Sequence, residues 1–276
     1  MSYYILVKGI NGFGNMMSVL NVAYHLAKSS KRTLVIDWTH PEWKVGFDEY
    51  FTFKDPNIKY LELNKFYEKV NNKNLEVYPK FFKDNLQKNL IDLKPNIDRD
   101  NNYHEFFDNC IKYADKKKYD IIVFSYNWLA YNDIKSLWNN LELKTPYDKL
   151  IQDKIKSLGD YKAIHIRNTD IKNVNLYWAL EFLMHNKDKT IYLATDDGEL
   201  LNKLKTQFNN IRNFTTYYDD NKPLHNCERS IEDKYKVNLD TLTDIYILVN
   251  SSELKITPIK TIPYMSTFSM LALALK

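Results

Sequence analysis

Residues 3–37, YYILVKGINGFGNMMSVLNVAYHLAKSSKRTLVID, decide the fold. The apolar run Tyr3–Val7 ends in a cluster of glycines, and from Asn15 onward apolar residues recur at the spacing of a helix. The β-branched run Thr33–Ile36 then ends at Asp37. This order predicts a strand, a loop, a helix and a second strand. Because a helical crossover joins parallel strands, we expect a parallel sheet from the start of the chain.

The rest of the chain continues this alternation. Apolar or β-branched runs predict strands at residues 120–125, 161–167, 190–195, 211–216 and 254–257. Helical spacing predicts helices at residues 134–143, 146–158, 198–208, 242–250 and 267–275. Residues 41–118 show weak periodicity and are predicted to be mixed helix and loop. A chain of 276 residues with alternation in both halves predicts an α/β fold with two Rossmann-like domains, residues 1–150 and 151–276.

The composition is that of a folded protein and argues against several partners. The aromatic fraction of 14% suits a packed core, and the net charge of only +4 is spread among acidic residues, so nucleic acid is not an expected partner. The two cysteines, Cys110 and Cys227, lack the spacing of a disulfide framework or zinc site. With no charged leader and no apolar stretch of about 18 residues, we expect no membrane span and a cytoplasmic location.

The first candidate binding segment is KGINGFGN, residues 8–15. Glycines allow close approach of a ligand, and the N-terminus of a helix offers unpaired N–H groups. The segment is neither a dinucleotide fingerprint, because Met17 stands where the third glycine belongs, nor a P-loop, because no G-K-[ST] follows. The alternative is an ordinary tight turn with Asn15 as the helix cap.

The second segment is AIHIRNTDIK, residues 163–172, at the end of a predicted strand, where α/β sheets place their ligands. Arg167 is one of only five arginines, and a guanidinium can grip a diphosphate with two parallel hydrogen bonds. In the alternative interpretation His165 is a core side chain, Arg167 pairs with a nearby carboxylate and Asp170 caps a helix.

Two further segments join a strand or turn to a helix. In LATDDGEL, residues 193–200, Asp196 and Asp197 are predicted to bind ribose hydroxyls or to cap the helix that follows. In MSTFSMLALAL, residues 265–275, a hydroxyl-rich helix start suits phosphate oxygens, and the alternative is an ordinary N-cap.

A metal site is not expected. Asp98 and Asp100 form a D-x-D pair, which holds a divalent ion in one class of sugar transferases. In that class the pair follows an apolar strand, whereas here it lies in the polar segment KPNIDRDNNY, residues 94–103. The sequence also contains no H-E-x-x-H or G-x-S-x-G motif, so these hydrolase classes are not indicated.

Together these segments resemble one family, the GDP-fucose-dependent fucosyltransferases, and most closely their rhizobial nodulation α-1,6-fucosyltransferase branch. The resemblance lies in residues 12–38, in HIRNTD (165–170), in YLATDD (192–197), in TDIYIL (243–248) and in STFS (266–269). These motifs occur in the family's order over nearly the whole chain.

The resemblance implies two Rossmann-like domains facing a cleft, the GT-B architecture. The donor, GDP-fucose, would lie in the C-terminal domain and a glycan acceptor on the side of the N-terminal domain, with inversion at the sugar and no metal or other cofactor. Arg167 matches the arginine at the donor diphosphate, His165 the histidine beside the nucleotide, and Asp244 an aspartate suited to the paired donors of guanine. From the resemblance and the segments above together, the predicted donor-binding set is completed by Gly12, Gly14, Lys172, Asp196, Asp197, Ser266, Thr267, Phe268 and Ser269.

The general base is left open by departures from the family. Relatives often carry a second basic residue where this chain has Asn168, and the glutamate of eukaryotic relatives is replaced within residues 173–175. Inverting transfer needs a base for the acceptor hydroxyl and a cation for the leaving diphosphate. The predicted catalytic candidates are Arg167, Asn15, Asp37 and Asp170.

Two other functions are compatible with the sequence. No residue pattern in the sequence indicates recognition of the methyl group of fucose. A GT-B transferase that uses another GDP-sugar, such as GDP-mannose, is therefore the first alternative. Because the base is unassigned, a non-catalytic protein that binds a sugar nucleotide or glycan is the second.

Overall fold

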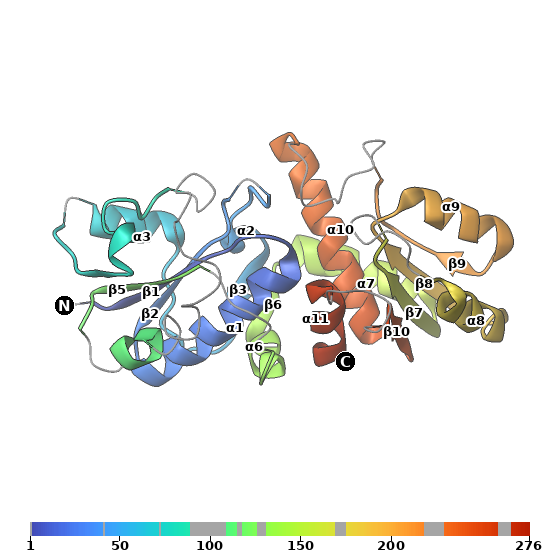
Figure 1. Ribbon diagram of the computed structural model, residues 1–276, viewed down its shortest axis with the longest axis horizontal. Helices are drawn as coiled ribbons and strands as arrows, with labels where there is room; N and C mark the ends of the chain where they lie inside the picture. Colours follow the sequence, from blue (N-terminus) through green and yellow to red (C-terminus); the bar gives the residue numbers. More distant parts are fainter. Residues whose placement is uncertain are drawn as a thin grey trace. The chain divides into compact units, whose positions relative to one another are not determined.

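The computed structural model describes residues 2–40, 42–71, 73–88, 109–114, 118–125, 131–168, 175–217, 229–258 and 266–276. The chain divides into two compact units, Met1–Lys144 and Thr145–Lys276 (Figure 1). The sequence-based boundary after residue 150 falls inside α7 (Thr145–Leu158), and the structure assigns this helix whole to the second unit. Within the described residues, no helix is both long enough and apolar enough to cross a membrane.

The first unit is built on a parallel sheet with the strand order β2-β1-β5-β4. Its main elements are β1 (Tyr4–Lys8), α1 (Phe13–Ser30), β2 (Thr33–Asp37), α3 (Leu63–Val70), β4 (Val77–Tyr78) and β5 (Ile121–Phe124). The smaller ones are α2 (Phe47–Tyr50), β3 (Phe51–Phe53), the 3-10 turn η1 (Lys80–Phe82), α6 (Ile134–Asn140) and β6 (Leu141–Leu143). The expected strand–helix–strand start of the chain is confirmed.

Alternation along the strands of the first unit places apolar side chains on both faces of the sheet. Tyr4 and Leu6 of β1 pack with Phe66 of α3, while Ile5 and Val7 point to the opposite face and are also fully buried. Helices α1 and α3 lie on opposite sides of the sheet (Figure 1). The register pairs Lys8, at the end of β1, with Asp37, at the end of β2.

The second unit contains a parallel sheet with the order β10-β7-β8-β9. Its remaining elements are β7 (Tyr161–Ile166), α8 (Tyr177–His185), β8 (Thr190–Thr195), α9 (Gly198–Gln207), β9 (Ile211–Arg212), α10 (Ile231–Asn250), β10 (Leu254–Ile256) and α11 (Thr267–Leu275). Helices α8 and α9 cover the face that carries Ile164 and Ile166, and α10 contacts β7 and β8. Both units are therefore helix-covered parallel sheets, as the alternation predicted.

Three sequence expectations were wrong in detail. The helix expected over 134–143 ends at Asn140, because Leu141–Leu143 alternates and pairs antiparallel with β3. The helix expected from 242 begins at Ile231; its first half is polar, and Ser230 caps it by accepting from the Asp233 N–H. The strand expected over 211–216 ends at Arg212.

Candidate active site in the second unit

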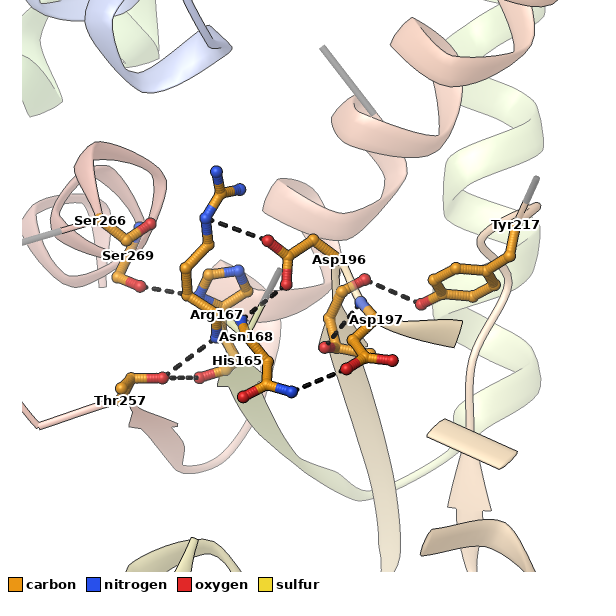
Figure 2. Close-up of polar contacts among 10 residues, drawn as sticks. His165, Arg167, Asn168, Asp196, Asp197, Tyr217, Thr257, Ser266 and Ser269 are labelled. Carbon is orange, nitrogen blue, oxygen red and sulfur yellow. Dashed lines mark hydrogen bonds and ion pairs between the residues drawn. The ribbon is translucent and has the colours of Figure 1, made fainter. Parts of the chain in front are cut away.

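The carboxyl ends of β7, β8 and β10 meet at one edge of the second sheet. Residues that follow a strand lie at this edge, so Arg167, Asp196 and Thr257 come together although they are far apart in sequence (Figure 2). The register pairs Ile166 with Thr195, which places Arg167 beside Asp196. Ligands of α/β proteins bind at the carboxyl ends of the strands, so these three residues mark a candidate binding site.

Arg167 is anchored by its neighbours. Its Nε lies 3.0 Å from Oδ2 of Asp196, and its backbone N–H donates to Oγ1 of Thr257 at 3.1 Å. The alternative in which Arg167 pairs with a nearby carboxylate is thus confirmed, and binding of a diphosphate by Arg167 stays a prediction. The bond to Asp196 uses Nε, and in Figure 2 the other two guanidinium nitrogens point away from that carboxylate. Such a fixed guanidinium is suited to oriented recognition of an anion.

Asp196 and Asp197 have different roles at the β8–α9 turn. Besides the arginine, Asp196 accepts a hydrogen bond from the Asn168 N–H at 2.8 Å. Asp197 is the N-cap of α9: its Oδ1 accepts from the Leu200 N–H at 2.9 Å, and its Oδ2 accepts from the Asn168 amide at 2.7 Å. The capping alternative is confirmed for Asp197. Contact of either carboxylate with ribose stays a prediction.

His165 connects β7 to the first turn of α11. Its Nδ1 lies 2.7 Å from Oγ of Ser269, and its ring centroid lies 5.2 Å from that of Phe268. Ser266 is the N-cap of α11 and accepts from the Ser269 N–H, so the N-cap alternative for this serine is confirmed; Thr267 is the first residue of the helix. Burial lowers the pKa of His165 to about 4, with Asp196 opposing and Arg167 adding to the shift. The imidazole is therefore neutral near pH 7.

Asp244 lies in the interior of α10 and not at its start, so it does not cap the helix. Oδ1 accepts from the Tyr192 hydroxyl at 2.5 Å, and Oγ1 of Thr215 lies 3.1 and 3.2 Å from the two carboxylate oxygens. The residue is only 8% exposed. The hydroxyl groups of Tyr192 and Thr215 already bond to this carboxylate, which argues against guanine recognition by Asp244; that role stays a prediction.

The burial of Asp244 predicts a pH dependence of stability. Burial raises the pKa of Asp244 from 3.8 to about 7, with a partly opposing hydrogen bond from Tyr192. Between about pH 4 and pH 7 the unfolded chain has released this proton and the folded chain keeps it, so stability falls as pH rises through that window. In urea titrations, the free energy of unfolding of the wild type should fall by up to about 1.4 kcal/mol per pH unit more than that of Asp244→Asn, because the variant has no carboxyl group to titrate. Identical pH slopes for the two proteins would contradict this assignment.

The glycine loop of the first unit begins α1 without a side-chain cap. Gly12, not Asn15, is the N-cap, and its carbonyl accepts from the Asn15 and Met16 N–H groups, so the alternative with Asn15 as the cap is wrong. Gly14 is buried, and its carbonyl accepts from the Tyr131 hydroxyl at 3.2 Å. Ligand contacts of Gly12, Gly14 and Asn15 stay predictions.

Asp37 is held in a buried ion pair at the end of β2. Its Oδ2 lies 2.8 Å from Nζ of Lys8 and also accepts from the Tyr67 hydroxyl at 3.1 Å, while Oδ1 accepts from the N–H and hydroxyl of Thr39. Burial favours a higher pKa for Asp37, but Lys8 and the hydrogen bonds outweigh it and hold the pKa below 3.8. A low pKa and so many donors argue against Asp37 as a general base; that role stays a prediction.

Two predicted site residues, Asp170 and Lys172, lie outside the described residues, as does the D-x-D pair of Asp98 and Asp100, which was not expected to bind a metal. Within the described part of the chain, no group of three or more His, Cys, Asp or Glu side chains is placed to hold a metal ion. Sequence reasoning also missed Thr257 and Tyr217. Thr257 is the last residue of a predicted strand, so the strand-end rule could have found it, whereas no motif marks Tyr217.

Several solved structures with the same fold are fucosyltransferases. A structure of NodZ alpha-1,6-fucosyltransferase soaked with GDP-fucose matches 100% of this chain and 93% of its own, with a TM-score of 0.68 and 17% identity. Fucosyltransferase NodZ from Bradyrhizobium matches 99% of this chain and 93% of its own, with a TM-score of 0.64 and 15% identity. POFUT1 in complex with GDP-fucose matches 99% and 94%, with a TM-score of 0.55 and 12% identity.

The sequence matches no protein-family model. No curated protein matches it either. At these low identities the structural likeness establishes the fold: an α/β chain with two Rossmann-like units of the GT-B type. The resemblance drawn from the sequence motifs is thus confirmed at the level of the fold.

Proposed function

We propose that this protein is a glycosyltransferase that moves fucose from GDP-fucose to a hydroxyl group of a glycan. The observation that carries the proposal is Arg167, held by Asp196 at the ligand edge of a sheet whose fold is that of GDP-fucose fucosyltransferases. An arginine in this place meets the chemical demand of the reaction, because the departing GDP carries its developing charge on the diphosphate. We place the donor in the second unit and the acceptor on the side of the first.

The proposed reaction is a single displacement with inversion at the anomeric carbon. The acceptor hydroxyl attacks, the bond between fucose and the β-phosphate oxygen breaks, and the hydroxyl proton passes to a base. Arg167, together with Lys172 and the first turn of α11 at Ser266, would stabilise the leaving diphosphate. His165 would support this site as a neutral side chain bonded to Ser269. Asp170 and Asp37 remain the candidates for the base, with Asp37 disfavoured by its ion pair with Lys8.

We also propose that the reaction proceeds without a metal ion. The positive charge that a metal supplies to a leaving diphosphate in other transferases would come here from the Arg167 guanidinium. Transfer should therefore be unchanged by a chelator and by the substitution Asp98→Ala. Activity that is lost with chelator and restored by manganese would contradict this part of the proposal.

Product analysis tests the function against its alternatives. The protein is incubated with GDP-fucose or GDP-mannose and a panel of glycans, while GDP release and the mass of each glycan are measured. A glycan that gains one deoxyhexose supports the proposal, and one that gains a hexose supports a transferase for another GDP-sugar. Tight binding of GDP-fucose without turnover on any glycan supports the non-catalytic alternative.

A further inference from the structure

The segment that follows β9, residues 213–217, is hydrogen-bonded to the second sheet and to α10. The Asn213 amide donates to the Leu193 carbonyl at 2.8 Å, and the Thr216 N–H donates to Oδ2 of Asp240 at 2.8 Å. Oγ1 of Thr215 meets Asp244, as described above. With contacts to β8 and to two carboxylates one turn apart on α10, residues 213–217 have a fixed position at the carboxyl end of β8.

This segment places Tyr217 against the β8–α9 turn. The Tyr217 hydroxyl donates to the Thr195 carbonyl at 2.8 Å (Figure 2). Its ring lies so close to Gly198 that a Cβ added there would be 3.0 Å from Cγ of the tyrosine. Burial raises the pKa of Tyr217, so the hydroxyl keeps its proton and acts as a donor. The ring and the hydroxyl thus hold both ends of the short segment 195–198.

Between these two anchors lie the two aspartates of the site. The Thr195 carbonyl belongs to the peptide group that leads into Asp196, and Oγ1 of Thr195 accepts from the Asp197 N–H at 3.2 Å. A rotation of that peptide group would move the Asp196 carboxylate, which is 3.0 Å from Nε of Arg167. A chain of direct contacts therefore runs from Tyr217 through the turn to the guanidinium.

We propose that Tyr217 is a positioning residue for donor binding: its hydroxyl and ring fix the 195–198 turn, so that Asp196 holds Arg167 in the orientation that grips the diphosphate. The inference rests on the proposed function, because it assumes that Arg167 binds the donor diphosphate. It does not require Tyr217 to touch the donor.

The chain supplies a matched control for Tyr217→Phe. The Tyr161 hydroxyl also donates to a backbone carbonyl, that of Ile247, at 2.8 Å, but Tyr161 begins β7 and so lies at the opposite edge of the same sheet. Tyr217→Phe and Tyr161→Phe each remove one hydrogen bond of the same kind. If the Tyr217 hydroxyl only stabilised the fold, Tyr217→Phe and Tyr161→Phe would have the same effect on GDP binding.

The experiment measures the dissociation constants of GDP and of guanosine, which lacks the diphosphate, for the wild type and both variants. We expect Tyr217→Phe to weaken GDP binding about three- to tenfold and to leave guanosine binding unchanged, while Tyr161→Phe changes neither. In the Arg167→Ala background, Tyr217→Phe should cause no further loss, because the two residues act in one chain of contacts. Equal GDP affinity for Tyr217→Phe and wild type, or parallel losses for GDP and guanosine, would overturn the inference.

Gly198→Ala tests the ring contact independently. The added methyl group meets the Tyr217 ring, so this variant should weaken GDP binding, and the loss should disappear when it is added to Tyr217→Ala, where no ring is left to displace. A loss that persists in the Tyr217→Ala background would contradict a role for the ring. If the wild type binds no GDP at all, the proposed function itself fails, which distinguishes that outcome from failure of the Tyr217 inference.

Discussion

Replacing Arg167 by alanine is expected to weaken GDP-fucose binding about ten- to hundredfold and to reduce turnover further. The charge-assisted hydrogen bonds to the diphosphate, on the order of 1.5 to 3 kcal/mol in the ground state, are lost, and charge that develops on the leaving group is no longer stabilised. Arg167→Lys should fail as well, because an ammonium group keeps the charge but lacks the planar fork. Calorimetry of donor binding and steady-state kinetics measure the two effects.

A second arginine of the same unit provides the control. Arg212, at the end of β9, is exposed and donates to the carbonyls of Asn209 and Ile211, so Arg212→Ala removes the same side chain away from Asp196. It should leave binding and turnover unchanged. If a folded Arg167→Ala protein retained normal affinity and turnover, the diphosphate assignment would be wrong.

Lys8→Met is expected to destabilise the protein by about 3 to 5 kcal/mol. The ion pair of Lys8 with Asp37 is buried, with side-chain exposures of 3% and 4%, and removal of the lysine leaves a buried carboxylate without its cation. The free energy of unfolding, measured by urea titration, should recover in large part when Lys8→Met is combined with Asp37→Leu. That recovery would show that apolar side chains can replace the ion pair, so that neither charge is needed for the fold.

The exposed pair of Lys28 with Asp55 is the matched control. Its nitrogen and oxygen are 2.7 Å apart, as close as those of the buried pair, but the side-chain exposures are 46% for Lys28 and 9% for Asp55, so water reaches the cation. Water screens such a pair, so Lys28→Met should change the stability little. Equal effects of Lys8→Met and Lys28→Met would show that burial does not determine the importance of the pair at Asp37.

The sequence predicted the sheets well because the strands carry their own signal. The runs at 161–167 and 190–195 place buried apolar residues on both faces, as expected for strands covered by helices, and both lie in the parallel sheet. Short elements were harder to predict. Leu141–Leu143 becomes a strand only because Phe51–Phe53 lies beside it, a long-range pairing that local periodicity does not contain.

For the candidate site, too, local features could be predicted from the sequence and long-range contacts could not. The N-cap roles of Asp197 and Ser266 could be predicted, because a cap depends on residues within three positions along the chain. The contact of Arg167 with Asp196 depends on the register of β7 against β8, and the burial of Asp244 depends on which face of α10 meets Tyr192. Neither register nor helix rotation follows from a motif, so these partners emerged only from the structure.

The central claim is that the ligand edge of the second sheet binds the diphosphate of a GDP-sugar. Its most direct test is a calorimetric titration of GDP-fucose into the wild type and Arg167→Ala, with chelator present throughout. The account predicts saturable binding to one site of the wild type and affinity about ten- to hundredfold lower for Arg167→Ala. Absence of saturable binding to the wild type, or the same affinity for both proteins, would contradict it.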